Sequence, residues 1–159
     1  MGKNHEKLVS PLLMWLIVII GIIIFVNIIP KTRIFTLGIF GLIIFLLTLV
    51  NWLYFFINAI NIHRKAAFSV SRIDKLVKSG VYSKVRHPIY SADIMLAFGI
   101  FFLYLTLNVL ISVIWLTFIL IIWMNLEEKS LISKFGNEYK EYKKKVPMFF
   151  PYKMSYKKL

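Results

Sequence analysis

The sequence predicts an all-α integral membrane protein, and three observations lead to this prediction. The chain of 159 residues is 59% hydrophobic, and its mean hydropathy is +0.75. Its charged residues lie almost entirely outside four long apolar runs, whereas a soluble domain would distribute polar residues along every helix. The runs lack the alternation that a transmembrane barrel requires, so we expect them to be helices.

Each apolar run predicts one transmembrane helix, because about 20 residues are needed to cross the hydrocarbon core. The four predicted helices cover residues 12–29, 34–60, 88–107 and 109–126. Pro30 to Arg33 link the first two runs, and Asn108 alone marks the turn between the last two. Such short links favour two antiparallel hairpins. The fold class that we expect is therefore four transmembrane helices in two hairpins, with short amphipathic helices on the cytoplasmic side.

The chain divides by polarity into two predicted domains. Residues 1–60 are expected to form an N-terminal transmembrane hairpin, and residues 61–159 a second unit. That second unit begins with a cytoplasmic segment, 61–87, and ends with another, 127–159. Within these segments we expect an amphipathic helix over 71–79, and beyond Glu128 a helical pattern that Gly136 interrupts and Pro147 ends.

The basic residues indicate the orientation in the membrane. Eighteen of the 20 Lys and Arg residues fall on the side of the two termini and the central loop, which leaves Lys31 and Arg33 on the other. The positive-inside rule predicts a multi-pass protein of the cell membrane with both termini in the cytoplasm. The net charge of +13 is then a topological signal, and we expect no nucleic-acid partner. The abundance of Ile, Lys and Asn indicates an AT-rich prokaryotic genome.

Metal and disulfide chemistry are not expected. The chain has no cysteine, which excludes a disulfide, a thiolate nucleophile and a Cys-based metal site. His5 and His63 stand in contexts without ligand spacing, so a metal site is not predicted.

A basic motif, Arg86-His87-Pro88-Ile89-Tyr90, stands at the start of the third apolar run. Pro88 suits the first position of a helix, and the free N–H groups of a first helical turn attract anions. The planar guanidinium of Arg86 matches a carboxylate or phosphate in bidentate fashion. The alternatives are that Arg86 is a positive-inside anchor and that His87 is a structural residue.

Three carboxylates complete the predicted site. Glu127 and Glu128 follow the fourth apolar run, where a helix C-terminus is unfavourable for negative charge. Since the two runs form a hairpin of nearly equal arms, Arg86 and Glu127 should lie at the same membrane face. Asp93 lies inside a membrane segment and is a functional candidate by default, or else a partner of Arg86, Lys84, Asn58 or Asn61. The glutamates could also be solvated residues at a helix end.

In their order these motifs resemble the isoprenylcysteine carboxyl methyltransferase and phospholipid methyltransferase group. The matching elements are Gly80-Val81-Tyr82, Arg86-His87-Pro88-x-Tyr90, Glu127-Glu128, Phe135-Gly136-x-Glu138-Tyr139-x-x-Tyr142, Pro147 and Pro151. The resemblance covers residues 70–152. One departure is Ala92, where members of the group often have glycine, and Asp93 is not part of the shared pattern.

The resemblance implies an integral membrane methyltransferase that uses S-adenosylmethionine and releases S-adenosylhomocysteine. The residues implied to bind the cofactor are Tyr82, Arg86, His87, Pro88, Tyr90, Glu127, Glu128, Phe135, Tyr139 and Tyr142. Arg86, Glu128 and Asp93 are the catalytic candidates. The acceptor is expected to be a lipidic or small molecule with a carboxylate, amine or thiol, and an amine or thiol would need a base such as Glu128, Asp93 or His87.

Two other functions fit parts of the sequence. A non-catalytic four-helix scaffold that binds anionic lipid or a protein partner would explain the basic face and the aromatic residues. It would not explain why the basic motif and the paired glutamates stand at facing helix ends. A small transporter with Asp93 in its path is disfavoured, because the predicted helices are unbroken.

Overall fold

The computed structural model of the chain describes residues 10–62 and 75–150, and within them it is all-helical. The order of the elements is α2 (Pro11–Ile28), α3 (Ile39–Ile62), η2 (Gly80–Ser83), α4 (Pro88–Tyr104), α5 (Leu107–Phe135) and α6 (Asn137–Lys145). Three of them, α2, α3 and α5, are long and apolar enough to cross a membrane. The fourth predicted span, α4, is also apolar but has only 17 residues.

The helices start and stop where the local chemistry predicts. Pro11 and Pro88 occupy the first turns of α2 and α4, where a missing N–H has no consequence. Gly136 adopts φ +55° and separates α5 from α6. As predicted, α6 then ends just before Pro147.

Two predicted boundaries are wrong. The turn between α4 and α5 lies at Leu105, which adopts a left-handed conformation with φ +49°, while Asn108 is buried in the first turn of α5. The predicted helix 71–79 lies partly outside the described residues, and the described part, 75–79, is not helical. Within this described part, Leu76 packs against the buried face of α6 that carries Tyr139 and Tyr142. Gly80 begins the short helix η2.

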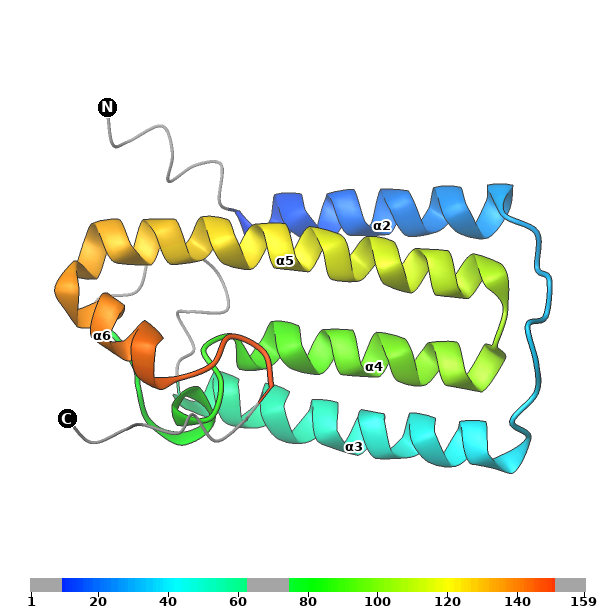
Figure 1. Ribbon diagram of the computed structural model, residues 1–159, viewed down its shortest axis with the longest axis horizontal. Coiled ribbons are helices and arrows are strands. Elements are labelled where there is room, and N and C mark those ends of the chain that lie inside the picture. Colours follow the sequence, from blue (N-terminus) through cyan, green and yellow to red (C-terminus); the bar gives the residue numbers. More distant parts are fainter. Residues whose placement is uncertain (1–9, 63–74, 151–159) are drawn as a thin grey trace.

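The first of the two expected hairpins is not formed, because α2 and α3 do not pack against each other. Figure 1 shows α2 beside α5, and α3 beside α4, with α4 and α5 in contact across the middle of the bundle. The connection from Ile29 to Gly38 crosses the end of the bundle, so α2 and α3 lie on opposite sides of it (Figure 1). This connection is fastened to the α4–α5 turn, because Leu107 donates to the Thr32 carbonyl at 2.9 Å and Ile34 to the Leu105 carbonyl at 2.8 Å.

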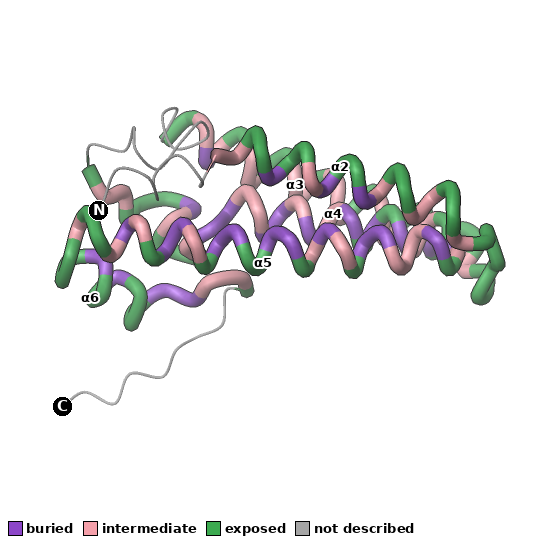
Figure 2. The backbone as a smooth tube through the Cα atoms, turned by 90° about the horizontal axis from the view of Figure 1, so that it is seen from above, coloured by how far each residue is buried: buried purple, intermediate pink, exposed green. Residues whose placement is uncertain are grey.

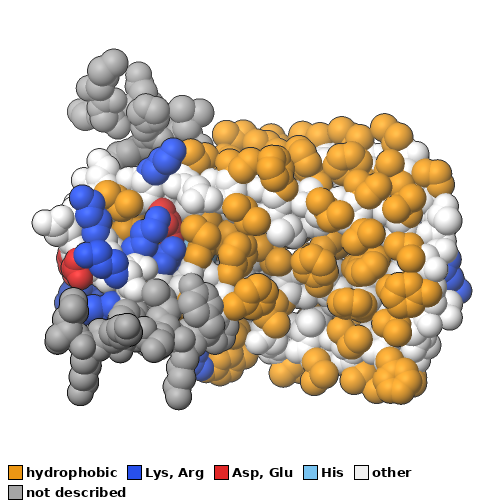
Figure 3. All heavy atoms as spheres, viewed as in Figure 1, with side chains coloured by type: hydrophobic (Ala, Val, Ile, Leu, Met, Phe, Trp, Pro, Cys, Tyr) orange, Lys and Arg blue, Asp and Glu red, His pale blue; other side chains and the backbone are white. Residues whose placement is uncertain are grey.

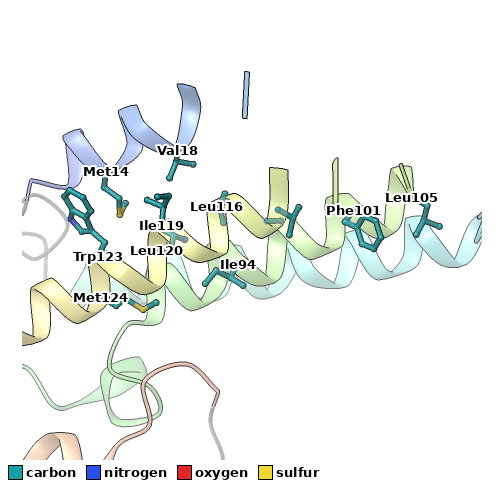
Figure 4. Close-up of a cluster of buried hydrophobic side chains, with 12 residues drawn as sticks. Met14, Val18, Ile94, Phe101, Leu105, Leu116, Ile119, Leu120, Trp123 and Met124 are labelled. Atoms are coloured by element: carbon teal, nitrogen blue, oxygen red, sulfur yellow. The ribbon is translucent and has the colours of Figure 1, made fainter. Parts of the chain in front are cut away.

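The core is built by α2, α4 and α5. Met14 and Val18 of α2 meet Leu120 and Trp123 of α5, as Figure 4 shows. The tube in Figure 2 is buried mainly along α5 and exposed along much of α2. The helix α5 is therefore the central element of the fold.

The backbones of α3 and α4 approach each other closely at two glycines, where a larger side chain would not fit. A Cβ atom added to Gly41 would lie 2.5 Å from the backbone oxygen of Phe102, and one added to Gly99 would lie 1.9 Å from the Thr48 hydroxyl. Small residues of this kind let helix backbones approach within a bilayer, where apolar side chains gain little from leaving lipid.

The surface divides along the bundle. Figure 3 shows apolar side chains over most of its length and a group of Lys and Arg side chains at the end that carries α6. Many large apolar side chains are exposed, for example Leu12 at 78% and Phe40 at 65%, which is unfavourable in water. This surface supports a membrane protein with one strongly basic end.

Candidate functional site

The candidate site lies at the basic end of the bundle, where the start of α4 meets α5. Arg86 lies two residues before the start of α4, and its Nε donates to Oε1 of Glu128 at 2.7 Å. Both side chains are buried, with exposures of 7% and 2%. Arg86 Nη1 also donates to the backbone carbonyls of Lys143, at 3.0 Å, and of Val146. The basic motif and the paired glutamates, 42 residues apart, are thus in direct contact.

The imidazole of His87 lies between the two glutamates. Its Nδ1 is 3.6 Å from Glu127 Oε2, and its Nε2 is 3.4 Å from Glu128 Oε1. Its ring stacks on that of Tyr90, with centroids 5.9 Å apart. The Tyr90 hydroxyl donates to Glu127 Oε1 at 2.7 Å. Pro88, between these residues in the motif, is fully buried.

The glutamates do not stand at a helix C-terminus, and that prediction was wrong. The helix α5 continues through Glu127 and Glu128 to Phe135, so the negative end of its dipole is two turns away. Both residues are buried, at 8% and 1% exposure. Buried carboxylates require partners, and these come from the start of α4 and from α6 instead of from the helix dipole.

The C-terminal strap, defined here as α6 with residues 146–150, covers this cluster. Its Lys143 Nζ lies 2.5 Å from Glu128 Oε2. Its Tyr142 hydroxyl donates to the Tyr82 carbonyl at 2.6 Å. The Arg86 backbone N–H donates in turn to the Pro147 carbonyl at 2.9 Å. The strap is therefore bound both to the residues before α4 and to Glu128.

The tyrosines of the predicted site surround the same cluster. Tyr139 and Tyr142 are buried, with ring centroids 5.8 Å apart. Burial, followed by the nearby Glu127 carboxylate, raises the pKa of Tyr82 to about 12. Burial also raises the pKa of Tyr139 and of Tyr142. Phe135 is half-buried and packs against the apolar side of the strap.

Polar atoms without partners mark where this site can accept a ligand. The Tyr139 hydroxyl is buried and forms no hydrogen bond within the described part of the chain. The indole N–H of Trp123 also has no partner among the described residues, but this ring belongs to the apolar core beside Met14. Since buried polar groups are normally paired, the Tyr139 hydroxyl is suited to bind an acceptor atom of a ligand.

Asp93 is oriented toward α3. Its Oδ1 accepts from the indole N–H of Trp52 at 2.7 Å, while Oδ2 is buried without a hydrogen-bond partner among residues 10–62 and 75–150. Neither Arg86 nor Lys84 pairs with it, since Lys84 contacts Tyr54 instead. None of the partners expected from the sequence is therefore the one observed.

Two functional candidates were missed by sequence reasoning. Lys143 stands in a run of three lysines, and only the phase of α6 distinguishes it from its neighbours. Trp52 looks like an ordinary apolar membrane residue in the sequence. Searching the described residues reveals no group of three or more His, Asp or Glu side chains that could hold a metal ion.

Comparison with known proteins supplies the family. The model of the phospholipid methyltransferase family matches residues 34–138, which include α3, α4 and all of α5. This chain belongs to that family, and the resemblance seen in its motifs is confirmed.

Two curated relatives are similar over part of the chain. Protein-S-isoprenylcysteine O-methyltransferase of Saccharomyces cerevisiae is 43% identical over 83 residues, which cover 48% of this chain and 33% of the relative. The protein of the same name from Schizosaccharomyces pombe is 38% identical over 82 residues, again 48% of this chain and 33% of the relative. The chain thus matches about a third of the length of these relatives. No solved structure matches it significantly.

Proposed function

We propose that this chain is an integral membrane methyltransferase that uses S-adenosylmethionine and acts on a lipidic or small-molecule acceptor at the cytoplasmic membrane face. Family membership and its named relatives support methyl transfer. The observation that carries the proposal is the buried cluster in which Arg86, His87 and Tyr90 contact Glu127 and Glu128 beneath the strap. A scaffold for anionic lipid does not need buried carboxylates on a membrane helix.

The residues of the cluster suit the chemical groups of the cofactor. When bound, S-adenosylmethionine supplies a methyl group activated by a sulfonium. Glu127 and Glu128 offer negative charge to its ammonium or its ribose hydroxyls. The Tyr90 and Tyr139 rings offer π faces to a cation, and the unpaired Tyr139 hydroxyl offers a donor to adenine or ribose.

The remaining requirements of the reaction are alignment and the exclusion of water. The strap, which covers the cluster, is suited to both. A carboxylate acceptor would need no base, whereas an amine or thiol would have to lose a proton. Asp93 has an oxygen without a hydrogen-bond partner in the part of the chain that the structure describes, and His87 has both nitrogens near carboxylates, so these two are the candidates for a base. Glu128 is the weaker candidate, since cations lie against both of its oxygens.

The proposed topology has four membrane helices, with the strap and both termini in the cytoplasm. The shorter α4 is proposed to cross with the others, because it packs along both α3 and α5. The basic end of the bundle in Figure 3 supports this orientation through the positive-inside rule. The division of the chain into two domains at residue 60 stays a prediction, as does a prokaryotic origin.

Ligand binding provides the first test. The full chain would be purified in detergent and titrated with S-adenosylmethionine and S-adenosylhomocysteine by calorimetry. We expect saturable binding, which Arg86→Ala and Glu127→Gln each weaken by about tenfold or more, since each substitution disturbs a charge-assisted contact. Lys144→Ala, a change at an exposed site on α6, is the matched control. A folded protein that binds neither compound at millimolar concentration would overturn the proposal.

The acceptor would then be sought by radiolabelled methyl transfer. Membranes from the source cell would be extracted, and the extract incubated with the purified chain and methyl-labelled cofactor. Label that partitions into the lipid phase supports a lipidic acceptor, and label that base then releases as volatile methanol identifies a methyl ester of a carboxylate. Label that stays in the aqueous phase, with none in lipid, would instead indicate a water-soluble acceptor.

A further inference from the structure

We propose that Glu128 and Lys143 together bind the amino-acid end of S-adenosylmethionine, and that Arg86 positions this pair without contacting the cofactor. The inference rests on the function proposed above and assigns roles within that site. It changes the role expected for Arg86, which the sequence had marked as the partner of the cofactor carboxylate.

Two of the three guanidinium nitrogens of Arg86 are already engaged with the protein. Its Nε donates to Glu128, and its Nη1 donates to two backbone carbonyls of the strap, those of Lys143 and Val146. The side chain is only 7% exposed. A ligand carboxylate could bind Nε or Nη1 only by breaking these buried bonds, which is unfavourable.

Lys143 has the opposite character. Its side chain is 43% exposed and carries a compact charge on a flexible stem. Its one ion-pair contact within the described residues is with Glu128 Oε2, at 2.5 Å. Its backbone carbonyl is held by Arg86, so the main chain is fixed while the side chain can swing. The ammonium can therefore leave Glu128 without disturbing the strap.

The end of the cofactor is a zwitterion that can insert into this ion pair. Its ammonium would take the place of Lys143 at Glu128 Oε2, and its carboxylate would receive the displaced Lys143. Glu128 Oε1 keeps Arg86, at 2.7 Å, and His87, at 3.4 Å. Each charge thus retains an opposite partner, and no buried charge is left uncompensated.

The test compares S-adenosylhomocysteine with its decarboxylated analogue, which keeps the amine and the adenosine. Calorimetry on the full chain in detergent gives both dissociation constants, and their ratio measures the contribution of the carboxylate. For the unsubstituted chain we expect the analogue to bind about ten- to a hundredfold more weakly. Lys143→Met should bring this ratio to about one, and Lys143→Arg should restore most of it, because only a cation is required.

Arg86→Lys distinguishes a positioning role from a direct one. We expect it to weaken both ligands by the same factor, so that the ratio is kept, and to make the strap more susceptible to limited proteolysis. Lys144→Met, on the same helix and next in sequence, should leave both constants unchanged. The inference would be refuted, and the proposed function left standing, if the ratio of the two dissociation constants stayed high in Lys143→Met. The same conclusion would follow if the ratio fell to about one in Arg86→Lys. Failure of the unsubstituted chain to bind either ligand would refute the proposed function as well.

Discussion

The hydrogen bond between Tyr90 and Glu127 gives the most direct test of the site. Tyr90→Phe removes one oxygen atom and retains the ring that stacks on His87. The lost bond is 2.7 Å long and ends on a carboxylate that is 8% exposed. Water cannot easily take the place of the hydroxyl, and His87 Nδ1 is 3.6 Å from the second carboxylate oxygen, too far for a good hydrogen bond.

These contacts set the expected magnitude. A hydrogen bond to a charged acceptor contributes about 1.5–3 kcal/mol, and the poor access of water favours the upper half of that range. We therefore expect Tyr90→Phe to lower the free energy of unfolding by about 2–3 kcal/mol. For a chain of this size, that corresponds to a melting temperature lower by about 4–12 °C.

A double-mutant cycle separates the bond from the packing of the ring. Tyr90→Phe, Glu127→Gln and the double variant would be unfolded in mixed detergent micelles, with tryptophan fluorescence as the signal. Because glutamine accepts only a neutral hydrogen bond, the cost of Tyr90→Phe should fall to about 1 kcal/mol in the Glu127→Gln background. Tyr104→Phe, at a residue that is 58% exposed, should cost close to nothing. An equal cost for Tyr90→Phe in both backgrounds would refute the reasoning.

Three further predictions concern packing and ionisation. Trp52→Phe removes the donor to Asp93. It should cost about 0.6 kcal/mol in the same unfolding assay, the average for hydrogen bonds between membrane helices, and at most about 1.7 kcal/mol. No loss of stability would mean that the bond is not formed. Gly41→Ala should lower the free energy of unfolding by about 1–3 kcal/mol, because the added methyl would meet a backbone oxygen that cannot move aside. Phe40→Ala, the control at the neighbouring exposed position, should lower it by less. The Tyr82 phenol, with its pKa raised from 10.0 to about 12, should titrate late in absorbance at alkaline pH. As the pH rises, this phenol ionises in the unfolded chain before it does in the folded chain. The burial of Tyr82 therefore contributes fully to stability below pH 10, and this contribution is lost between about pH 10 and about pH 12. Titration of the phenol near pH 10 in the folded protein would contradict its burial.

The class of fold could be predicted from the sequence, and so could the contact between the basic motif that begins at Arg86 and the paired glutamates. Continuous apolar runs can only be helices in a membrane, and the nearly equal arms of the last two runs bring Arg86 to the level of the glutamates. The faces of α6 were also predictable, because Tyr139, Tyr142 and Val146 repeat at helical spacing, and all three are buried.

The partners of the helices were not predictable. The helix α2 is apolar on every side, so its sequence offers no face that distinguishes α5 from α3. The packing of α2 on α5 depends on the shapes of the two surfaces. A Cβ atom added to Gly21 would lie 1.9 Å from the Trp115 indole, so the ring fills the space that a side chain at Gly21 would need. Complementarity of this kind appears only when both helices are in place. The same holds for Lys143, whose selection from three adjacent lysines depends on the rotation of α6.

The arrangement makes α5 the common support of the whole site. It is one unbroken helix that carries the apolar core in its first half and Glu127 and Glu128 further along. The helices α2, α4 and α6 all pack against it. A change in how α2 seats on α5 can therefore shift the glutamates relative to Arg86, although α2 lies outside the residues that match the family. Because buried ion pairs tolerate little displacement, α2 is expected to influence ligand affinity through the rigidity of α5, without touching the ligand.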